Sequence, residues 1–492
     1  MECVKKVNKW DFVELVFEIE ANKKYFIEAD IYAIFKHQDR TLKVKGFYDD
    51  NGKFIIRFMP TIEGIWKYIT YSNIDELNKK AGSIECIAAK ENIHGLVKVA
   101  DKYHFAFSDG DVYYPFGTTA YVWNYQTDEV QEETLETLKK SPFNKIRMCV
   151  FPKHYDYNLR EPEMTPFMGN IKDGFDFTQF NVEFFHKLEE QILALQKLNI
   201  EVDLILFHPY DRWGFATMPE EVDLRYISYV VARLSAFRNV WWSLANEYDL
   251  MTNKSNVFWD KIFDKLVEED PYNHLCSIHN WHCPTYHYRS NKHWYDHKKE
   301  WVTHASIQHH DMYFIPEWRE EYKKPIMIDE CRYEGNMDLG WGNISGQKMT
   351  MLFWQAVVSG AYATHGETFM NDDEIIWWAH GGRLIGESPK RIAFLRQIIE
   401  TGVAKRLIPF VHERHWDANI GKNKDENYYL IYFGDACPKY RHMDMLPEGK
   451  QYKAEIIDTW NMTITSIDEV VTNKSTIQMY SRPYMAIRLT AI

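Results

Sequence analysis

The chain has 492 residues, of which 45% are hydrophobic and 16% aromatic, and its formal net charge at pH 7 is −13. This length predicts two or three domains. Because the balance is acidic and no block of lysine or arginine occurs, we expect neither a nucleic-acid partner nor binding to an anionic membrane. An uncharged substrate fits better than a strongly acidic one, although a local basic pocket would override this preference.

The cysteines and the apolar runs of the sequence indicate in which cellular compartment the protein is expected. The seven cysteines have no regular spacing, so we expect neither a disulfide framework nor a zinc site built from them. Cys149, Cys276 and Cys331 lie in or beside expected strands, as buried free thiols would. The N-terminus lacks the apolar segment of a signal peptide, and no apolar run reaches membrane-spanning length. We therefore expect a cytoplasmic protein with no membrane partner.

Residues 1–92 have the pattern of a small β-sandwich. Val13, Leu15 and Phe17 recur at every second position, which is the period of a half-buried strand. The segment Asp49–Gly52 separates two strand-like runs and predicts a hairpin turn. No helical periodicity of useful length appears in this part of the chain.

Residues 93–403 alternate strand-like apolar runs with amphipathic helices. Phe184, Leu188 and Ile192, for example, fall on one face of an expected helix. Eight strands alternating with helices predict an α/β fold of the (β/α)8 TIM barrel type, and a doubly wound sheet is the structural alternative. The expected strands are residues 114–119, 145–151, 200–207, 240–247, 275–280, 305–310, 325–330 and 362–367.

Residues 404–492 return to a strand pattern. The clearest expected strands are residues 428–433, 453–458 and 485–490, and Pro447–Lys450 has the composition of a turn. This predicts a C-terminal β-sandwich beside the barrel. The expected architecture is thus a TIM barrel flanked by an N-terminal and a C-terminal β-sandwich domain.

Two of the expected barrel strands end in a glutamate, Glu247 at strand four and Glu330 at strand seven. The carboxyl ends of barrel strands carry the active site, and strands four and seven face each other across the mouth. Two carboxylates there are the minimum equipment for cleaving a glycosidic bond. Either glutamate alone would more often be a solvated residue at a strand boundary, but their pairing at strands four and seven favours catalysis. Asn246 points away from Glu247 in an ideal strand, so a local bulge would be needed for both to reach the pocket.

Polar and aromatic residues at other strand ends are candidates for contact with a sugar, because hydroxyl groups need polar partners and the C–H face packs on aromatic rings. The candidate substrate-binding residues are Arg147, His208, His279, His310, Tyr313, Trp123, Trp281, Trp378 and Glu367. Each of them could instead pack a loop or form a structural ion pair. Histidines at several strand ends could also hold a metal, but their spacing is not diagnostic. We expect no metal and no cofactor.

The dipeptide Asn246-Glu247, together with Glu330, resembles clan A of the glycoside hydrolases. More narrowly, nearly the whole chain resembles the apiosidase-like glycoside hydrolases, which carry an N-terminal β-sandwich, a barrel and a C-terminal β domain. The matching stretches are Phe58-Met59-Pro60 with Gly64 and Trp66, then Tyr114–Thr119, and finally Leu384–Pro389.

The resemblance implies roles for several residues. The strand-four glutamate of the clan is the acid/base, which corresponds to Glu247, and the strand-seven glutamate is the nucleophile, which corresponds to Glu330. The clan asparagine, here Asn246, hydrogen-bonds the sugar 2-hydroxyl, and an arginine on strand two, here Arg147, is often oriented toward the nucleophile. The clan commonly places a histidine or tyrosine after strand six.

These observations predict a retaining O-glycoside hydrolase. The family resemblance implies plant-type oligosaccharides or polysaccharide side chains as substrates, with apiose among the candidate sugars. We expect the charge of Glu330 to raise the pKa of Glu247 and keep it protonated near neutrality. The alternatives are a non-catalytic carbohydrate-binding protein on a barrel scaffold, and a transglycosylase or phosphorylase that uses the same glutamates. The sequence decides neither the sugar and linkage, nor exo against endo action, nor the oligomeric state.

Overall fold

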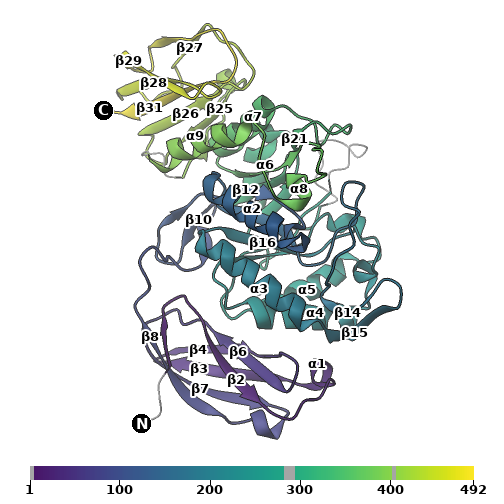
Figure 1. The fold of residues 1–492 in the computed structure, drawn as a ribbon. Coiled ribbons are helices and arrows are strands. Elements are labelled where there is room, and N and C mark those ends of the chain that lie inside the picture. The colour runs from purple at the N-terminus through teal and green to yellow at the C-terminus, as the bar shows by residue number, and fades with distance from the viewer. Residues whose placement is uncertain (1–4, 282–293, 402–405) are drawn as a thin grey trace.

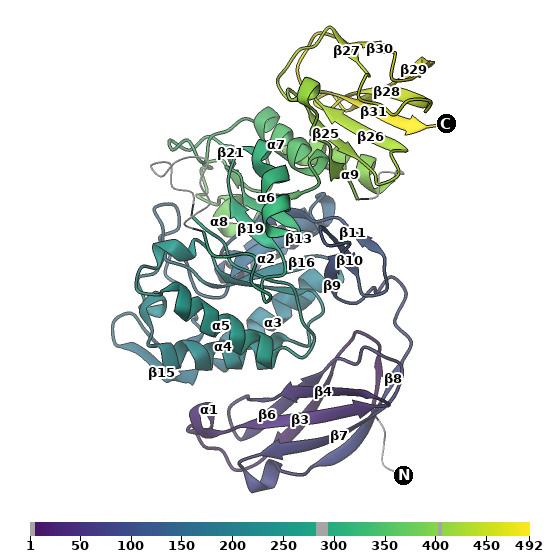
Figure 2. The same ribbon diagram turned by 180° about the vertical axis from the view of Figure 1, so that it is seen from behind.

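The computed structural model describes residues 5–281, 294–401 and 406–492, which form three parts arranged in a row (Figure 1). The N-terminal strands lie at one end, the helix-rich part with its central sheet lies in the middle, and the C-terminal strands lie at the other end. The view from behind shows the same order (Figure 2).

The N-terminal part is a sandwich of two sheets. Its elements are β1 (Lys5–Asn8), β2 (Val13–Glu18), α1 (Tyr25–Glu28), β3 (Ile31–His37), β4 (Arg40–Lys45), β5 (Phe47–Tyr48), β6 (Lys53–Phe58), β7 (Gly64–Ser72) and β8 (Ala81–Ile87). One sheet has the order β1-β8-β7-β3-β4 and the other β2-β6-β5. Phe35 on β3 and Phe58 on β6 stack across the sandwich with ring centroids 3.8 Å apart. The expected hairpin turn joins β5 and β6.

A small sheet covers the base of the barrel. It consists of β9 (Val97–Ala100), β10 (His104–Phe107) and β11 (Val112–Tyr113). The Phe105 ring packs 5.3 Å from Trp241 and 5.4 Å from Tyr362, near the start of two barrel strands. This sheet therefore closes the end of the barrel that lies opposite the strand tips carrying Glu247 and Glu330.

The eight expected barrel strands all lie in one parallel sheet, in the order β18-β17-β16-β13-β12-β22-β20-β19. An isolated parallel bridge between His279 and Ser306 joins the two edges, so the sheet closes as a TIM barrel. Several strands are shorter than the apolar runs suggested, since loop residues at their ends are also buried. The strands are β12 (Phe116–Thr119), β13 (Lys145–Cys149), β16 (Glu201–Phe207), β17 (Val240–Ala245), β18 (Cys276–Ser277), β19 (Ala305–Gln308), β20 (Ile326–Glu330) and β22 (Tyr362–His365).

Amphipathic helices surround the barrel and bury their apolar faces against it; Phe184, Leu188 and Ile192 on one of them are buried, as their spacing predicts. The helices are α2 (Asp128–Lys140), α3 (Val182–Lys197), α4 (Glu220–Leu234), α5 (Asn256–Glu269), α6 (Ile315–Tyr322), α7 (Gly346–Val358), α8 (Trp377–His380) and α9 (Ser388–Glu400). Short elements in the loops are the strands β14 (Phe167–Asn170), β15 (Gly174–Phe180), β21 (Glu334–Gly335) and β23 (Glu367–Thr368), and the 3-10 helices η1 (Asp75–Leu77), η2 (Trp123–Tyr125), η3 (Phe215–Thr217), η4 (Tyr248–Leu250), η5 (Met312–Phe314) and η6 (Glu413–His415).

The barrel interior contains a buried network of charges. Lys145 Nζ lies 2.7 Å from Asp203 Oδ2 and 2.7 Å from Asp329 Oδ1, and all three side chains are fully buried. Because β13 and β20 are not neighbours in the sheet, the contact between Lys145 and Asp329 crosses the interior. Burial opposes ionisation of Asp329, yet Lys145 and Arg147 hold its pKa well below its ordinary value.

The C-terminal part is a six-stranded sheet of order β24-β25-β26-β31-β28-β29, with a two-stranded ribbon of β27 and β30 beside it. Its strands are β24 (Ile408–Pro409), β25 (Asn419–Lys422), β26 (Tyr428–Tyr432), β27 (Tyr440–His442), β28 (Tyr452–Asp458), β29 (Thr463–Val471), β30 (Thr476–Gln478) and β31 (Met485–Ala491). The Tyr432 ring packs on Trp354 of α7, with centroids 5.4 Å apart, so this sheet is packed against the barrel.

A buried ion cluster joins the N-terminal sandwich to the barrel helices. Arg57 of β6 donates to Glu189 of α3, with 2.7 Å between Nη2 and Oε2. Arg233 of α4 donates to the same glutamate at 2.6 Å and to Asp49 at 2.9 Å. These four side chains are nearly inaccessible to solvent, so the two parts share one polar core as well as apolar contacts.

Candidate active site

A cavity of about 540 Å³ opens at the carboxyl ends of the barrel strands and contains both Glu247 and Glu330. It is large enough for a small sugar. The lining residues are Tyr121, Lys153, Tyr155, Tyr210, Asn246, Glu247, Trp281, Gln308, His309, His310, Glu330, Arg332, Tyr333, Gly340, Trp341 and Trp378.

Glu247 reaches this cavity through a left-handed backbone conformation. It directly follows the last two residues of the strand-four run, Ala245 and Asn246, and has φ 48° and ψ 49°. This conformation is uncommon for a residue other than glycine and reverses the strand direction before η4. The predicted bulge is therefore replaced by a single left-handed residue, which brings Asn246 and Glu247 to the same cavity.

Glu330 ends β20 beside an irregularity in the ladder. Ile307 pairs with Ile328, whereas Gln308 pairs with Glu330, so Asp329 is an extra residue on its strand. The extra residue lets Asp329 join the interior network while Glu330 faces the cavity. This bulge at strand seven was not predicted from the sequence.

The two glutamates have opposite electrostatic environments. Burial, followed by the charge of Glu330, raises the pKa of Glu247 to about 8. Burial also opposes ionisation of Glu330, but His279, Arg147 and Lys153 outweigh it and lower the pKa of Glu330 to about 2. Near neutral pH one carboxyl is mostly protonated and the other is ionised.

Hydrogen bonds hold both carboxyl groups in place. The Tyr121 hydroxyl donates to Glu330 Oε1, and the Tyr210 hydroxyl donates to Glu247 Oε2. Gln308 Nε2 donates to Glu330 Oε2 at 3.2 Å, and the same side chain hydrogen-bonds Glu247. The side-chain amide of Gln308 thus bridges the carboxyl groups of Glu247 and Glu330.

Asn246 is oriented by the arginine on strand two. Arg147 Nη2 donates to Asn246 Oδ1 at 3.0 Å. This bond uses the amide oxygen of Asn246. The Nδ2 group of the same amide remains as a donor for a ligand in the cavity. Arg147 itself is fully buried and does not line the cavity, so its predicted place beside substrate is corrected to a position behind Asn246.

Two of the predicted histidines lie behind the cavity wall. His279 is fully buried, and its Nε2 lies 3.4 Å from Glu330 Oε1 while its Nδ1 lies 3.0 Å from Ser306 Oγ. His208 is buried with Nε2 3.2 Å from the carbonyl oxygen of Phe151. Neither lines the cavity, since each strand turns its histidine into the protein interior.

Among the other predicted residues, Trp281, Trp378 and His310 line the cavity. Trp123 and Glu367 are buried away from the cavity, which corrects their prediction as substrate contacts. Tyr313 does not line the cavity either, and its contact with substrate stays a prediction. Trp123 is fully buried with Nε1 3.3 Å from Met148 Sδ, and Tyr313 is 52% exposed outside the cavity. Glu367 Oε2 accepts from the backbone N–H groups of Ile385 at 2.9 Å and Gly386 at 3.0 Å, so it serves the start of the α9 segment.

Sequence reasoning missed several cavity residues, above all Lys153, Tyr121, Tyr210, Gln308 and Trp341. Four of them lie in loops or in the residues just after a strand. Gln308 lies within an expected strand that holds several polar residues, so its polarity alone did not mark it as a cavity residue. An aromatic or basic residue in a loop carries no periodic signal, so only the folded arrangement identifies it.

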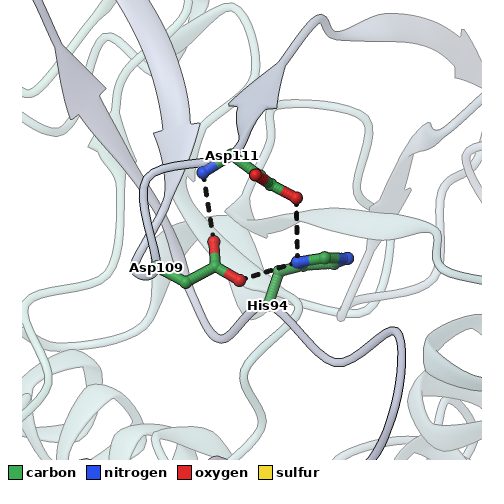
Figure 3. Close-up of side chains that lie close together, drawn as sticks. All are labelled: His94, Asp109 and Asp111. Atoms are coloured by element: carbon green, nitrogen blue, oxygen red, sulfur yellow. Dashed lines mark hydrogen bonds and ion pairs between the residues drawn. The ribbon is translucent and has the colours of Figure 1, made fainter.

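In the part of the chain that the structure describes, two groups of acidic and histidine side chains have the composition of metal ligands. At the base of the barrel, His94 Nδ1 lies 2.7 Å from Asp109 and 3.3 Å from Asp111 (Figure 3). These residues are solvent-accessible and already hydrogen-bond one another, which accounts for their closeness.

The second group, Glu334, His365 and Glu367, is buried. Glu334 accepts from the backbone N–H of Glu387 at 2.7 Å and of Ser388 at 3.1 Å, at the N-terminus of α9. Negative charge is favourable there because the first N–H groups of a helix lack intrahelical partners. Both acidic residues therefore have structural partners, and neither group lies in the cavity.

Comparisons with known proteins agree with this architecture. A family model described as "Apiosidase-like, catalytic domain" matches residues 100–420, and models described as domains of unknown function (DUF5060 and DUF5605) match residues 6–73 and 416–490. The crystal structure of a candidate glycoside hydrolase from Bacteroides vulgatus ATCC 8482 matches with a TM-score of 0.91 at 37% identity, over 99% of this chain and 100% of the other. No curated protein matches the sequence.

A glycoside hydrolase family 5 structure from the same organism matches with a TM-score of 0.60 at 15% identity, over 81% of this chain and 94% of the other, and it shares the fold. Within the described ranges, no helix is both long and apolar enough to cross a membrane.

Proposed function

The chain belongs to the apiosidase-like glycoside hydrolases, and from this premise we propose that it cleaves O-glycosidic bonds with retention of anomeric configuration. The observation that carries the proposal is the pair of glutamates in one cavity, with the pKa of Glu247 raised to about 8 and that of Glu330 lowered to about 2. Retaining and inverting enzymes both need one protonated and one ionised carboxyl group at rest. Retention is favoured because the side chain of Gln308 hydrogen-bonds both carboxyl groups, and retaining enzymes hold the two groups closer together than inverting enzymes do.

In the first step the ionised Glu330 attacks the anomeric carbon. The glycosidic C–O bond breaks, and Glu247 gives its proton to the departing oxygen. Tyr121 and Gln308 hold the two oxygens of Glu330, so its attack begins from a fixed position. The Nδ2 group of Asn246 is placed to donate to a sugar hydroxyl next to the reacting carbon.

In the second step water attacks the anomeric carbon of the glycosyl-enzyme ester. Glu247 takes a proton from the water, and Glu330 departs as a carboxylate. Esterification removes the charge that helps to raise the pKa of Glu247, so Glu247 becomes a better proton acceptor once the intermediate has formed.

We propose plant-type oligosaccharides or polysaccharide side chains as the substrate class. The support is the family itself, together with the aromatic rings of Trp281, Trp341 and Trp378 around the cavity. Indole rings offer flat apolar faces to the C–H side of a sugar, while Asn246 and Gln308 offer polar groups to its hydroxyls.

Trapping of the covalent intermediate tests this mechanism. Aryl 2-deoxy-2-fluoro glycosides with a good leaving group should add one fluorosugar to the wild-type protein, on the peptide that contains Glu330. The matched control, Glu330→Gln, should gain no mass. Turnover by the wild type without an adduct, or a first-formed product of inverted configuration by NMR, would contradict the proposal.

A further inference from the structure

Lys153 is a buried lysine at the cavity with no carboxylate in direct contact, although Glu247 and Glu330 lie near enough to interact with its charge. Its side chain is 5% exposed, and its Nζ lies 3.7 Å from the centroid of the Tyr121 ring, 4.2 Å from Tyr210 and 4.7 Å from Trp378. Within residues 5–281, 294–401 and 406–492 this ammonium group makes no ion pair and no hydrogen bond. Aromatic faces attract a cation but accept no strong hydrogen bond, so the ammonium group keeps unused donors.

The other buried lysines of the described chain show what such a group normally requires. Lys145 lies between two aspartates at 2.7 Å each. Lys254 also lies over aromatic rings, those of Phe207 and Phe258, but it forms an ion pair with Asp223 as well. A buried ammonium group without a carboxylate is therefore exceptional in this protein, and burial of an unpaired charge is costly.

The charge of the residues that line the cavity also favours an anionic ligand. Its lining contains two carboxyl groups, Glu247 and Glu330, and two cations, Lys153 and Arg332. With Glu247 protonated and both Lys153 and Arg332 charged, the lining carries a net positive charge inside a protein whose net charge is −13. Burial lowers the pKa of Lys153, and a bound anion would raise it again. The expectation of an uncharged substrate, which rested on the overall charge, does not hold for this local environment.

We propose that the cavity recognises an acidic sugar, and that Lys153 binds the carboxylate of that sugar. The inference rests on the proposed function and deepens it, because it assigns the substrate class as glycosides of uronic acids. A carboxylate ligand would supply the acceptor that Lys153 lacks, in a charge-assisted hydrogen bond.

The position of Lys153 identifies which sugar carries the carboxylate. Lys153 lies over Tyr121, whose hydroxyl holds Glu330, and over Tyr210, whose hydroxyl holds Glu247. The sugar that spans the two carboxyl groups is the one attacked by Glu330. Lys153 therefore faces the glycone, the sugar that becomes bound to the enzyme, and not the leaving group.

Calorimetric binding of free sugars to the wild-type protein tests the inference without any need for turnover. The probes are D-glucuronate, D-galacturonate and D-mannuronate, each compared with its neutral parent hexose, and sodium sulfate serves as a plain anion. We expect at least one uronate to bind about tenfold or more tightly than its parent, because a charge-assisted hydrogen bond to a buried group is worth at least that factor. Lys153→Met should abolish this preference and leave the affinity for the neutral sugar nearly unchanged.

Arg332→Gln is the matched control, since Arg332 lines the same cavity but is exposed. A general effect of positive charge would weaken uronate binding in both variants, and sulfate would then compete with the uronate. Absence of any uronate preference in the wild type, or its persistence in Lys153→Met, overturns the inference. Thermal unfolding of each variant confirms that the comparison is made on folded protein.

Hydrolysis of aryl glycosides separates this inference from the proposed mechanism. If neutral glycosides are cleaved with dependence on Glu247 and Glu330 while no uronate binds preferentially, the mechanism stands and the acidic-sugar inference fails. If uronates bind through Lys153 but aryl uronides are not cleaved through these glutamates, the binding inference stands and the mechanism fails. A role of Lys153 limited to tuning the two glutamates would lower kcat equally on uronides and neutral glycosides, which also overturns the inference.

Discussion

Two pairs of buried glutamates lie near the carboxyl ends of barrel strands, and their partners differ. Glu334 accepts two backbone N–H groups at the start of α9, and Glu367 accepts two from the residues just before that helix. Glu247 and Glu330 face a cavity, and their partners are side chains, among them Tyr210 and Tyr121. Burial is similar in both pairs. The comparison teaches that the donors around a buried carboxyl group, and the space beside it, distinguish a structural from a chemical role.

Neutralising the cavity pair should have the largest effect on activity. Glu330→Gln and Glu247→Gln should each lower kcat at least about 1,000-fold on a glycoside with a poor leaving group, because each removes a group that acts only in the transition state. Unfolding temperatures should change little. Glu334→Gln and Glu367→Gln, assayed per folded molecule, are the matched controls. A loss of similar size in either control would erase the contrast between the pairs.

Glu367 should contribute to the pH dependence of stability. Burial raises the pKa of Glu367 to about 8, so the folded protein binds its proton more tightly than the unfolded chain does. This contribution is complete below the unfolded pKa and is lost as pH rises through about 8. Glu367→Gln removes the titration and should lessen the fall in the free energy of unfolding between pH 5 and 8 by about 2–4 kcal/mol.

Urea unfolding of wild type and Glu367→Gln at both pH values measures this difference, since the other buried carboxyl groups cancel in the comparison. An identical pH dependence in the two proteins would show that Glu367 is ionised in the fold.

The cavity pair should set the alkaline limb of activity. Glu247 must be protonated to act as the acid, and its pKa is raised to about 8. We expect kcat/KM to fall about tenfold for each pH unit above that value. Glu330, with a pKa of about 2, should produce no limb between pH 4 and 8. A substrate with an excellent leaving group, which needs no acid, should lose the alkaline limb, whereas an unchanged limb would assign it to another residue.

The smallest expected effect is that of Glu334→Gln on stability. The substitution removes a negative charge from the N-terminus of α9 and replaces one acceptor oxygen by a donor that faces other donors. It should lower the free energy of unfolding by about 1–3 kcal/mol, measured by urea unfolding at constant pH. If Glu334→Gln is as stable as the wild-type protein, Glu334 has no stabilising role.

The barrel strands were predictable because each is a run of buried apolar residues, as in residues 240–247, and because parallel strands place their carboxyl ends together. The convergence of Glu247 and Glu330 on one cavity followed from that rule. The direction of individual side chains did not follow, since proximity to a strand end does not decide on which side a residue emerges. Trp123, beside strand one, is fully buried in the core for this reason.

Other features depend on contacts between segments far apart in the sequence. The local sequence around Lys153 does not predict that the rings of Tyr210 and Trp378 will lie beside its ammonium group. The left-handed conformation of Glu247 is likewise decided by the turn that the barrel imposes. Tertiary constraint of this kind has no periodic signature in the chain.

The shared ion cluster of Arg57, Glu189, Arg233 and Asp49 limits how modular the protein can be. Exchange of the N-terminal sheets for an unrelated module would leave Glu189 and Arg233 facing new neighbours without Arg57 and Asp49. A replacement domain would have to place a guanidinium group and a carboxylate at the positions of Arg57 and Asp49. Otherwise Glu189 of α3 and Arg233 of α4 would have to be substituted as well. The N-terminal sheets and helices α3 and α4 therefore form one structural unit. A chimera in which the N-terminal sheets are exchanged without these helices should fold poorly.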